Sequence, residues 1–280
     1  MDNYNLKGNP VIQNVPIIGN IVYDDLGEAL ISKYNEIFKG TPAEHKVKYK
    51  KGQIITNSNV PLALKINQML SKNSEFSGLG LRVLTPVDVI QHWGVLPERD
   101  PTYADTNSIV ANPNKGANED LRQDFMNIKG KKSKIPLVVS GLDVEKVYND
   151  YGFKFIGTDF MEVEEAEHLT KNGRLAIDED GKIVSSDKGV PVYVDSSQSG
   201  SSQSGLRRLY RYGNGLGAWN GNLLSSSVNG RVQIYQDPKG LAQDFQKAYA
   251  LMQRQAEEQK AVIDERTKKA EIYLKTGKFE

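Results

Sequence analysis

The chain has 280 residues with 36 basic and 35 acidic side chains, and its net charge of +1 creates no overall field towards nucleic acid or a membrane surface. It has no cysteine, which excludes disulfides, iron–sulfur clusters and cysteine-based zinc sites. No apolar run approaches the roughly 20 residues of a membrane-spanning helix, and the start lacks the basic-then-apolar layout of a secretion signal. We therefore expect a protein of the cytoplasm, or of a particle assembled there.

Residues 1–20 predict an extended arm, because the Asn9-Pro10 and Val15-Pro16 steps disfavour helix. The arm has too many apolar side chains for a disordered tail. They can form an edge strand on the protein's own core or contact a neighbouring subunit, and both interpretations stay open. The candidate subunit contacts in the arm are Val11, Ile12, Ile17 and Ile18.

Residues 21–134 predict a mixed α/β body. Asp24 or Asp25 can cap a helix that Gly40 ends, and a second helix is expected at 62–70. Thr85-Pro86-Val87-Asp88 predicts another helix start, with a hydroxyl cap, proline at the first position and an acid at the third. Residues 97–117 are expected to be a long polar loop of the kind that contacts partners.

Residues 135–195 predict a small α+β unit. Helices are expected from Ser140 and from Thr158, and Asp178–Gly181 is expected to be a hairpin turn. The expected strands of this unit are 137–139, 153–156, 175–177, 183–185 and 190–194.

Two tandem SSQSG copies at 196–205 indicate a flexible spacer. Residues 206–237 then combine glycine, asparagine and aromatic residues. Since glycine and asparagine tolerate positive φ, we expect a compact β module of two short strands around a loop.

Asp237-Pro238 predicts the start of a long helix over 238–277, with an apolar stripe. About 36 helical residues would span roughly 54 Å, more than the roughly 45 Å of a compact remainder. The helix therefore either bends near 254–260 or projects and is covered by a partner. Its candidate oligomer contacts are Val262, Ile263, Tyr273 and Leu274. The expected fold class is thus α+β, a multi-part chain with a small Gly/Asn-rich β module and a long C-terminal helix.

The chemical signals predict no catalytic residue, no metal site and no cofactor. The three histidines show no ligand spacing. The acidic run at 162–167 is expected on the solvated face of a helix, and Asp178–Gly181 lacks the later ligands of a calcium loop. The GNGLG stretch at 213–217 is not followed by the helix of a phosphate-binding loop.

The 206–237 module carries the candidate binding surface, where cations and rings can meet a glycan or a single-stranded nucleic acid. The plainer interpretation is a strand with Leu206, Leu209 or Tyr210 inward and arginines in water. The candidate residues are Arg207, Arg208, Tyr210, Arg211, Tyr212, Trp219, Asn220 and Asn222.

The order of residues in this stretch resembles lectin-like modules akin to the formylglycine-generating enzyme, including the retroelement-diversified modules of phage proteins. The resemblance covers about 30 residues and is carried by Arg207…Arg211, Gly213-Asn214-Gly215, Trp219-Asn220-x-Asn222 and Asn229-Gly230-Arg231-Val232. It implies display of a binding loop on a stable scaffold. The chain departs from that family in having only a spacer before the module and a further segment after it.

The layout of arm, mixed body, spacer, module and helical tail is also similar to structural proteins of tailed-phage virions. The first hypothesis is therefore a non-enzymatic, multi-copy virion component of the head-tail or tail region, such as a head-tail connector. It would bind other copies and other virion proteins through the arm and the C-terminal helix. The alternatives are a display protein that binds a cell-surface glycan or receptor, and, less favoured, a nucleic-acid-binding protein; no membrane partner is expected.

Overall fold

The computed structural model describes residues 17–72, 76, 80–96, 103–116, 118–123, 133–194, 205–213, 215–219 and 222–236. All of them belong to one compact unit that spans residues 16–236, which is called the body below.

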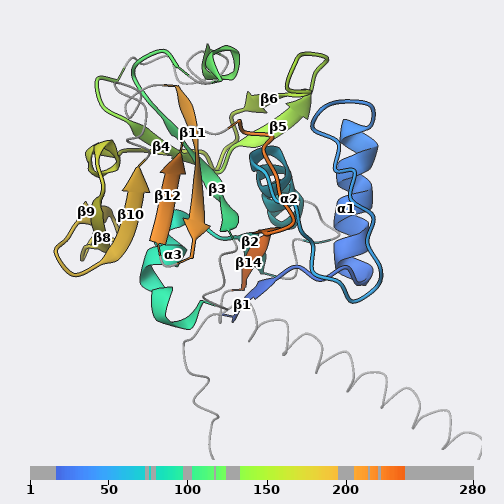
Figure 1. Ribbon diagram of the computed structural model, residues 1–280, viewed down its shortest axis with the longest axis horizontal. Helices are drawn as coiled ribbons and strands as arrows, with labels where there is room; N and C mark the ends of the chain where they lie inside the picture. Colours follow the sequence, from blue (N-terminus) through green and yellow to red (C-terminus); the bar gives the residue numbers. More distant parts are fainter. Residues whose placement is uncertain are drawn as a thin grey trace, which may run out of the picture. The chain divides into compact units, whose positions relative to one another are not determined.

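The body is organised around a nine-stranded sheet in the order β7-β4-β3-β11-β12-β10-β8-β9, with β13 also paired to β3 (Figure 1). The long strand β3 pairs with β4 on one side and with β11 on the other, antiparallel in both cases. β12 is antiparallel to β11 and parallel to β10. The strands are β3 (Tyr103–Ala111), β4 (Leu137–Ser140), β7 (Glu162–Glu165), β8 (Gly173–Ile177), β9 (Ile183–Ser185), β10 (Val190–Val194), β11 (Leu206–Tyr212), β12 (Gly215–Trp219) and β13 (Gly230–Arg231).

Alternation along the strands divides the hydrophobic core between the two faces of this sheet. On one face, Ile109 and Val139 belong to the core cluster that includes the buried residues of α1 (Asp25–Phe38) and α2 (Val60–Lys72). On the other face, Val110 and Val138 belong to the cluster around α3 (Pro86–Gln91). Two short 3-10 helices lie at Trp93–Val95 and Glu167–Thr170, and residues 119–123 are also helical.

The predicted helix starts at Asp24 and Thr85 are confirmed. The Asp24 carboxylate accepts hydrogen bonds from the backbone N–H groups of Leu26 and Gly27, each at 3.1 Å. Thr85 and Asp88 form a reciprocal capping box at the start of α3. Both signals are local, and the side chains satisfy N–H groups that have no partner within the helix.

Two small sheets complete the body. One has the order β1-β14-β2 and consists of β1 (Ile17–Asn20), β14 (Gln233–Gln236) and β2 (Leu81–Val83). The other is a hairpin of β5 (Asp143–Lys146) and β6 (Phe153–Ile156). Within the predicted arm, residues 17–20 are therefore an edge strand of the protein's own fold, and Ile18 packs against the core of α3.

The described part of the chain is predominantly β, so the predicted α+β class is wrong. The helix expected from Ser140 is replaced by β5 and a turn, and the helix expected from Thr158 by β7 and a 3-10 turn. The loop expected at 97–117 contains β3, which pairs at the middle of the large sheet. The expected turn at Asp178–Gly181 is confirmed between β8 and β9, where Gly181 has φ +80°.

The predicted domain boundaries inside the body do not match its structure. β11 and β12 lie between β3 and β10, so residues 206–219 are part of the same sheet as the preceding body and do not form a separate module. Their predicted partners in the module, β13 and β14, pair with β3 and with the small sheet. The predicted helix at 238–277 and the arm residues Val11 and Ile12 lie outside the described residues.

Candidate functional site

The predicted binding surface on β11 is mostly inside the protein. Arg207, Arg208 and Arg211 are only 1%, 7% and 4% exposed, and Tyr210 is 9% exposed. Tyr212, at 43%, and Asn222 are exposed. The backbone of Trp219 lies in β12 opposite Arg208, and Asn220 is outside the described residues. Four of the eight predicted residues are therefore buried. The plainer interpretation is confirmed for Leu206, Leu209 and Tyr210, which lie inside the body. The three arginines that it placed in water are buried as well, so they do not form an exposed cationic surface.

The buried Arg208 forms an ion pair with Asp105 of β3. Its Nε and Nη2 donate to the two carboxylate oxygens at 2.9 and 2.8 Å, and its Nη1 donates to the carbonyl oxygen of Ser225 at 2.7 Å. The hydroxyl of Ser58 donates to the same carboxylate at 2.7 Å. The Arg208–Asp105 pair connects β3 and β11 to the loops of Ser58 and Ser225, so its role is structural.

Two tyrosines flank this ion pair. The guanidinium of Arg208 lies 4.9 Å from the ring centre of Tyr103 and 5.5 Å from that of Tyr210. Burial raises the pKa of Tyr210, which stays neutral. The hydroxyl of Tyr103 donates to the carbonyl oxygen of Ser58 and accepts from the backbone N–H of Ser227, both at 3.0 Å. These contacts close the space around Arg208 with rings and backbone.

Arg211 connects the large sheet to the small one. Its Nη1 donates to Oε1 of Gln233 at 3.0 Å, and Nε2 of Gln233 donates to Oδ1 of Asn20 at the same distance. Burial lowers the pKa of Arg211. Of the predicted binding arginines, Arg211 thus connects two sheets, and Arg208 connects β11 to β3 within the large sheet.

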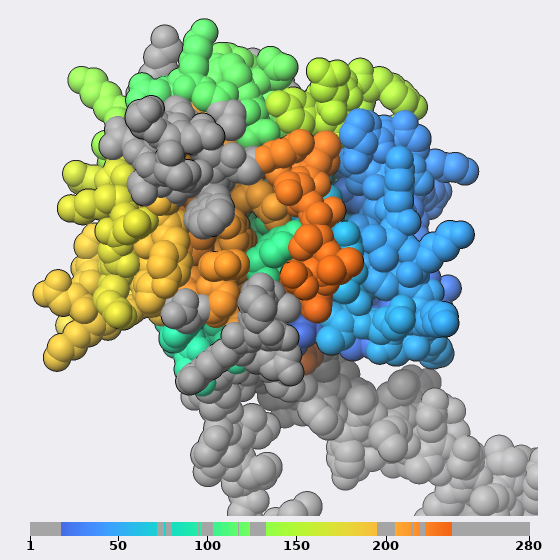
Figure 2. Space-filling view, in the orientation of Figure 1, coloured from blue at the N-terminus to red at the C-terminus, as the bar shows by residue number. Residues whose placement is uncertain are grey.

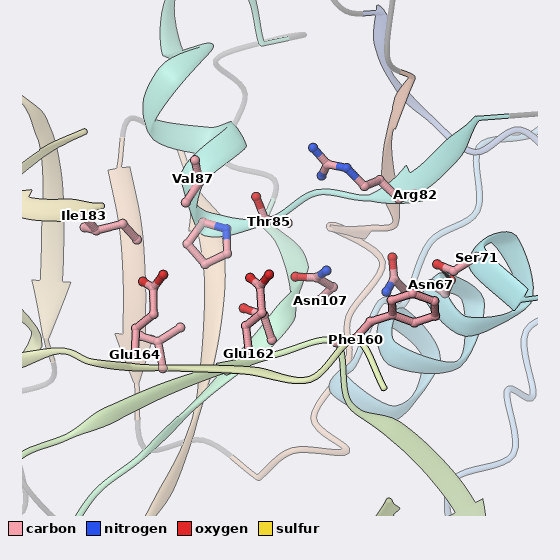
Figure 3. A pocket seen from close by; sticks show the side chains of 14 residues that line it. Asn67, Ser71, Arg82, Thr85, Val87, Asn107, Phe160, Glu162, Glu164 and Ile183 are labelled. Atoms are coloured by element: carbon pink, nitrogen blue, oxygen red, sulfur yellow. Dashed lines mark hydrogen bonds between the residues drawn. The ribbon is translucent and has the colours of Figure 1, made fainter. Parts of the chain in front are cut away.

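A cavity of about 400 Å³ lies on the α3 side of the large sheet (Figure 3). Its walls come from the end of α2, the β2–α3 segment, β3, β4, β7, the turn before β7 and the start of β9. The lining residues are Asn67, Ser71, Arg82, Thr85, Pro86, Val87, Asn107, Val138, Ser140, Gly141, Phe160, Glu162, Glu164 and Ile183. This volume lies within the range of small-molecule pockets.

Alternation along β7 places two carboxylates in this cavity. Glu162 pairs with Ser140 and Glu164 with Val138, so both side chains lie on the α3 face of the sheet. Figure 3 shows them projecting into the cavity in the same direction. Between them, Val163 packs against the opposite core cluster. The expected helical arrangement of this acidic run is wrong, because a two-residue period orders it.

The wall of the cavity opposite β7 contains Thr85 of the α3 capping box and Arg82. Arg82 forms an ion pair with Asp88, and its guanidinium lies 4.1 Å from the ring centre of Tyr235. Asp88 is 3% exposed, so this carboxylate belongs to the wall rather than to the open space. The arginine in the cavity is thus already neutralised by a carboxylate.

Two asparagine amides are built into the cavity. Asn67 is 5% exposed, and its Oδ1 accepts the backbone N–H of Val83 at 3.0 Å. Asn107 is 6% exposed, and its Oδ1 accepts the hydroxyl of Ser108 at 2.9 Å. Within the described part of the chain, neither Nδ2 group has a hydrogen-bond partner. Sequence reasoning missed both residues, because a single buried asparagine carries no recognisable spacing.

The histidines do not form a site with each other or with acids. Nε2 of His45 lies 2.7 Å from the hydroxyl of Tyr49, and burial lowers the pKa of His45 to about 4. Burial also lowers the pKa of His168. Among the described residues, no group of three or more His, Asp or Glu side chains is placed to hold a metal ion.

The first and last strands of the body pair with each other. In the antiparallel register of β1 and β14, Ile17 faces Gln236. The two ends of the body therefore lie side by side.

On the face shown in Figure 2, the orange segment that contains β11 to β14 lies between the blue N-terminal part and the yellow strands, so residues late in the sequence pack between earlier ones.

Comparison of the chain with protein-family models, with curated proteins and with solved structures finds no match. Nowhere in the described residues does a helix combine the length and the hydrophobicity needed to cross a membrane.

Proposed function

We propose that this chain is a non-enzymatic assembly protein that is present in several copies in a larger particle, and that residues 1–16 and 237–280 bind neighbouring subunits. The observation that carries the proposal is the pairing of Ile17 with Gln236. Because these residues end the body, both outer segments leave it from adjacent points. Two segments that begin together can form one contact region.

The surface of the body supports the assignment of subunit binding to the two outer segments. Among the described residues, the large apolar side chains that are exposed are Ile54, Tyr148, Phe160, Tyr212 and Val228. They are single residues from five different segments of the chain. The outer segments, in contrast, contain repeated apolar residues in their sequence. Subunit contacts are therefore assigned to them rather than to the body.

The proposed particle is the virion of a tailed phage, with the chain in the head-tail or tail region. The support for this setting is the sequence layout, which combines an arm, a body, a tail with periodic apolar residues and no cysteine. An alternative function as a display protein would have to use residues other than Arg207, Arg208, Tyr210 and Arg211, since these are buried.

Sedimentation velocity of the full chain tests the proposal. We expect a defined oligomer, and replacement of Val262 and Ile263 by aspartate should convert it to monomer without changing the circular dichroism of the body. Tyr148→Asp is the matched control, because this side chain is 87% exposed on the body, and it should leave the oligomer intact. A wild-type chain that remains a monomer at high concentration would refute the assignment.

A further inference from the structure

We infer that the cavity between α3 and β7 binds a small polyhydroxyl ligand, that is, one or two units of a saccharide. This inference concerns a site that the assembly proposal does not use. It is carried by the unusual combination of groups in the cavity: two carboxylates, two partly unsatisfied amides and an exposed aromatic ring.

The carboxylates supply hydrogen-bond acceptors. Glu162 and Glu164 are exposed side chains, and in the described part of the chain neither has a hydrogen-bond or ion-pair partner. Successive residues on one face of a strand are about 7 Å apart, a spacing at which two carboxylates can contact different hydroxyls of one ring. Figure 3 shows both reaching into the space below Thr85 and Val87.

The amides supply donors. The backbone N–H of Val83 fixes Oδ1 of Asn67, so Nδ2 is the end of this side chain that is left to bind another group. Asn107 is held in the same way through Oδ1 by Ser108. Neither Nδ2 group is among the fully buried polar atoms that lack a partner in the described part of the chain, so both are accessible to a small molecule and can donate a hydrogen bond to it. These two side chains are at least nine-tenths buried, and each lines the cavity.

The charge balance excludes other classes of ligand. The guanidinium of Arg82 is paired with Asp88, so the unpaired charges of the cavity are the two carboxylates. They repel phosphate and carboxylate ligands. A ligand with only cationic donors would leave the amides of Asn67 and Asn107 without acceptors. A hydroxyl both donates and accepts, so a polyol satisfies both sets of groups.

The ring of Phe160 supplies an apolar surface in the cavity. Its side chain is 61% exposed and lines the cavity. An exposed ring offers an apolar surface on which the C–H face of a sugar can lie. The cavity volume of about 400 Å³ suits a ligand of this size.

The test is a glycan array probed with the labelled full chain, followed by calorimetry with the saccharide that binds best. We expect binding that falls at least tenfold in Glu162→Gln and in Glu164→Gln. Glu165→Gln is the matched control, because Glu165 lies on the same strand and pairs with Leu137, on the opposite face of the sheet. It should bind like the wild type.

Phe160→Ala provides a second, independent readout. It should weaken binding of the same saccharide, with at most a small shift in unfolding temperature, because the side chain is 61% exposed. The inference is overturned if no saccharide on the array binds, or if a saccharide binds equally well to Glu162→Gln, Glu164→Gln and Phe160→Ala. The oligomeric state is measured separately, so failure here leaves the assembly proposal to its own test.

Discussion

The buried pair of Arg208 and Asp105 allows a quantitative prediction for Asp105→Asn. The side chains are 8% and 0% exposed, and the carboxylate accepts two hydrogen bonds from the guanidinium and one from Ser58. Burial lowers the pKa of Arg208, and the charge of Asp105 raises it. Because arginine is effectively always protonated in proteins, Arg208 keeps its charge with or without Asp105. The substitution thus leaves a buried cation without its counter-ion, which costs about 3–5 kcal/mol of the free energy of unfolding.

The assay is urea unfolding of the full chain, with the change in free energy taken from the shift in midpoint. Arg208→Met in the Asp105→Asn background should cost much less than the sum of the two single changes, because it removes the uncompensated charge. As a control, Lys51→Ala removes an ion pair whose side chains are 80% and 94% exposed and should not shift the midpoint measurably. A cost below about 1 kcal/mol for Asp105→Asn, the range of surface pairs, would show that the pair is accessible to water.

Three further predictions concern the stability of the body. Burial lowers the pKa of His45 from 6.5 to about 4, so the unfolded chain takes up the proton first as the pH falls. The free energy of unfolding should therefore drop by about 3 kcal/mol between pH 6.5 and pH 4. His45→Gln should reduce this drop when the free energy of unfolding is measured against pH. Gly189→Ala should lower the unfolding temperature, because the added Cβ would overlap the carbonyl oxygen of Leu175; Gly173→Ala meets nothing within 4 Å and should not. Thr85→Ala removes the α3 cap and should cost about 1 kcal/mol in urea unfolding, and no loss would contradict the capping role.

Local signals in the sequence predicted the elements that local contacts determine. The caps at Asp24 and Thr85, and the strands at 153–156 and 190–194, follow from neighbouring residues and are confirmed. In contrast, β3 is not recognisable in isolation. Its middle reads Asp105-Thr106-Asn107-Ser108, which is typical of a loop, and all four side chains are buried. Asp105, Thr106 and Ser108 have side-chain partners in distant segments.

The same reason explains the errors around β11 and β7. Arginines in a sequence favour a solvated surface, and only the presence of Asp105 about one hundred residues earlier makes burial of Arg208 favourable. In and just after β7, the four glutamates within 162–167 also fit an exposed helix face. The two-residue period is visible only when the core contacts of Val163 are known. The amides of the cavity had no sequence signal, since single asparagines carry no recognisable spacing and the contact of Asn67 with Val83 is long-range.

The position of β11 in the middle of the large sheet has a consequence for biosynthesis. A ribosome makes β3, and then β10, before the strands β11 and β12 that lie between them. Until residues 206–219 emerge, the nascent chain has two unfilled strand edges, which are prone to pair with other polypeptides. Completion of the sheet must therefore wait for nearly the whole body to be translated, and chains truncated before residue 206 should depend on chaperones.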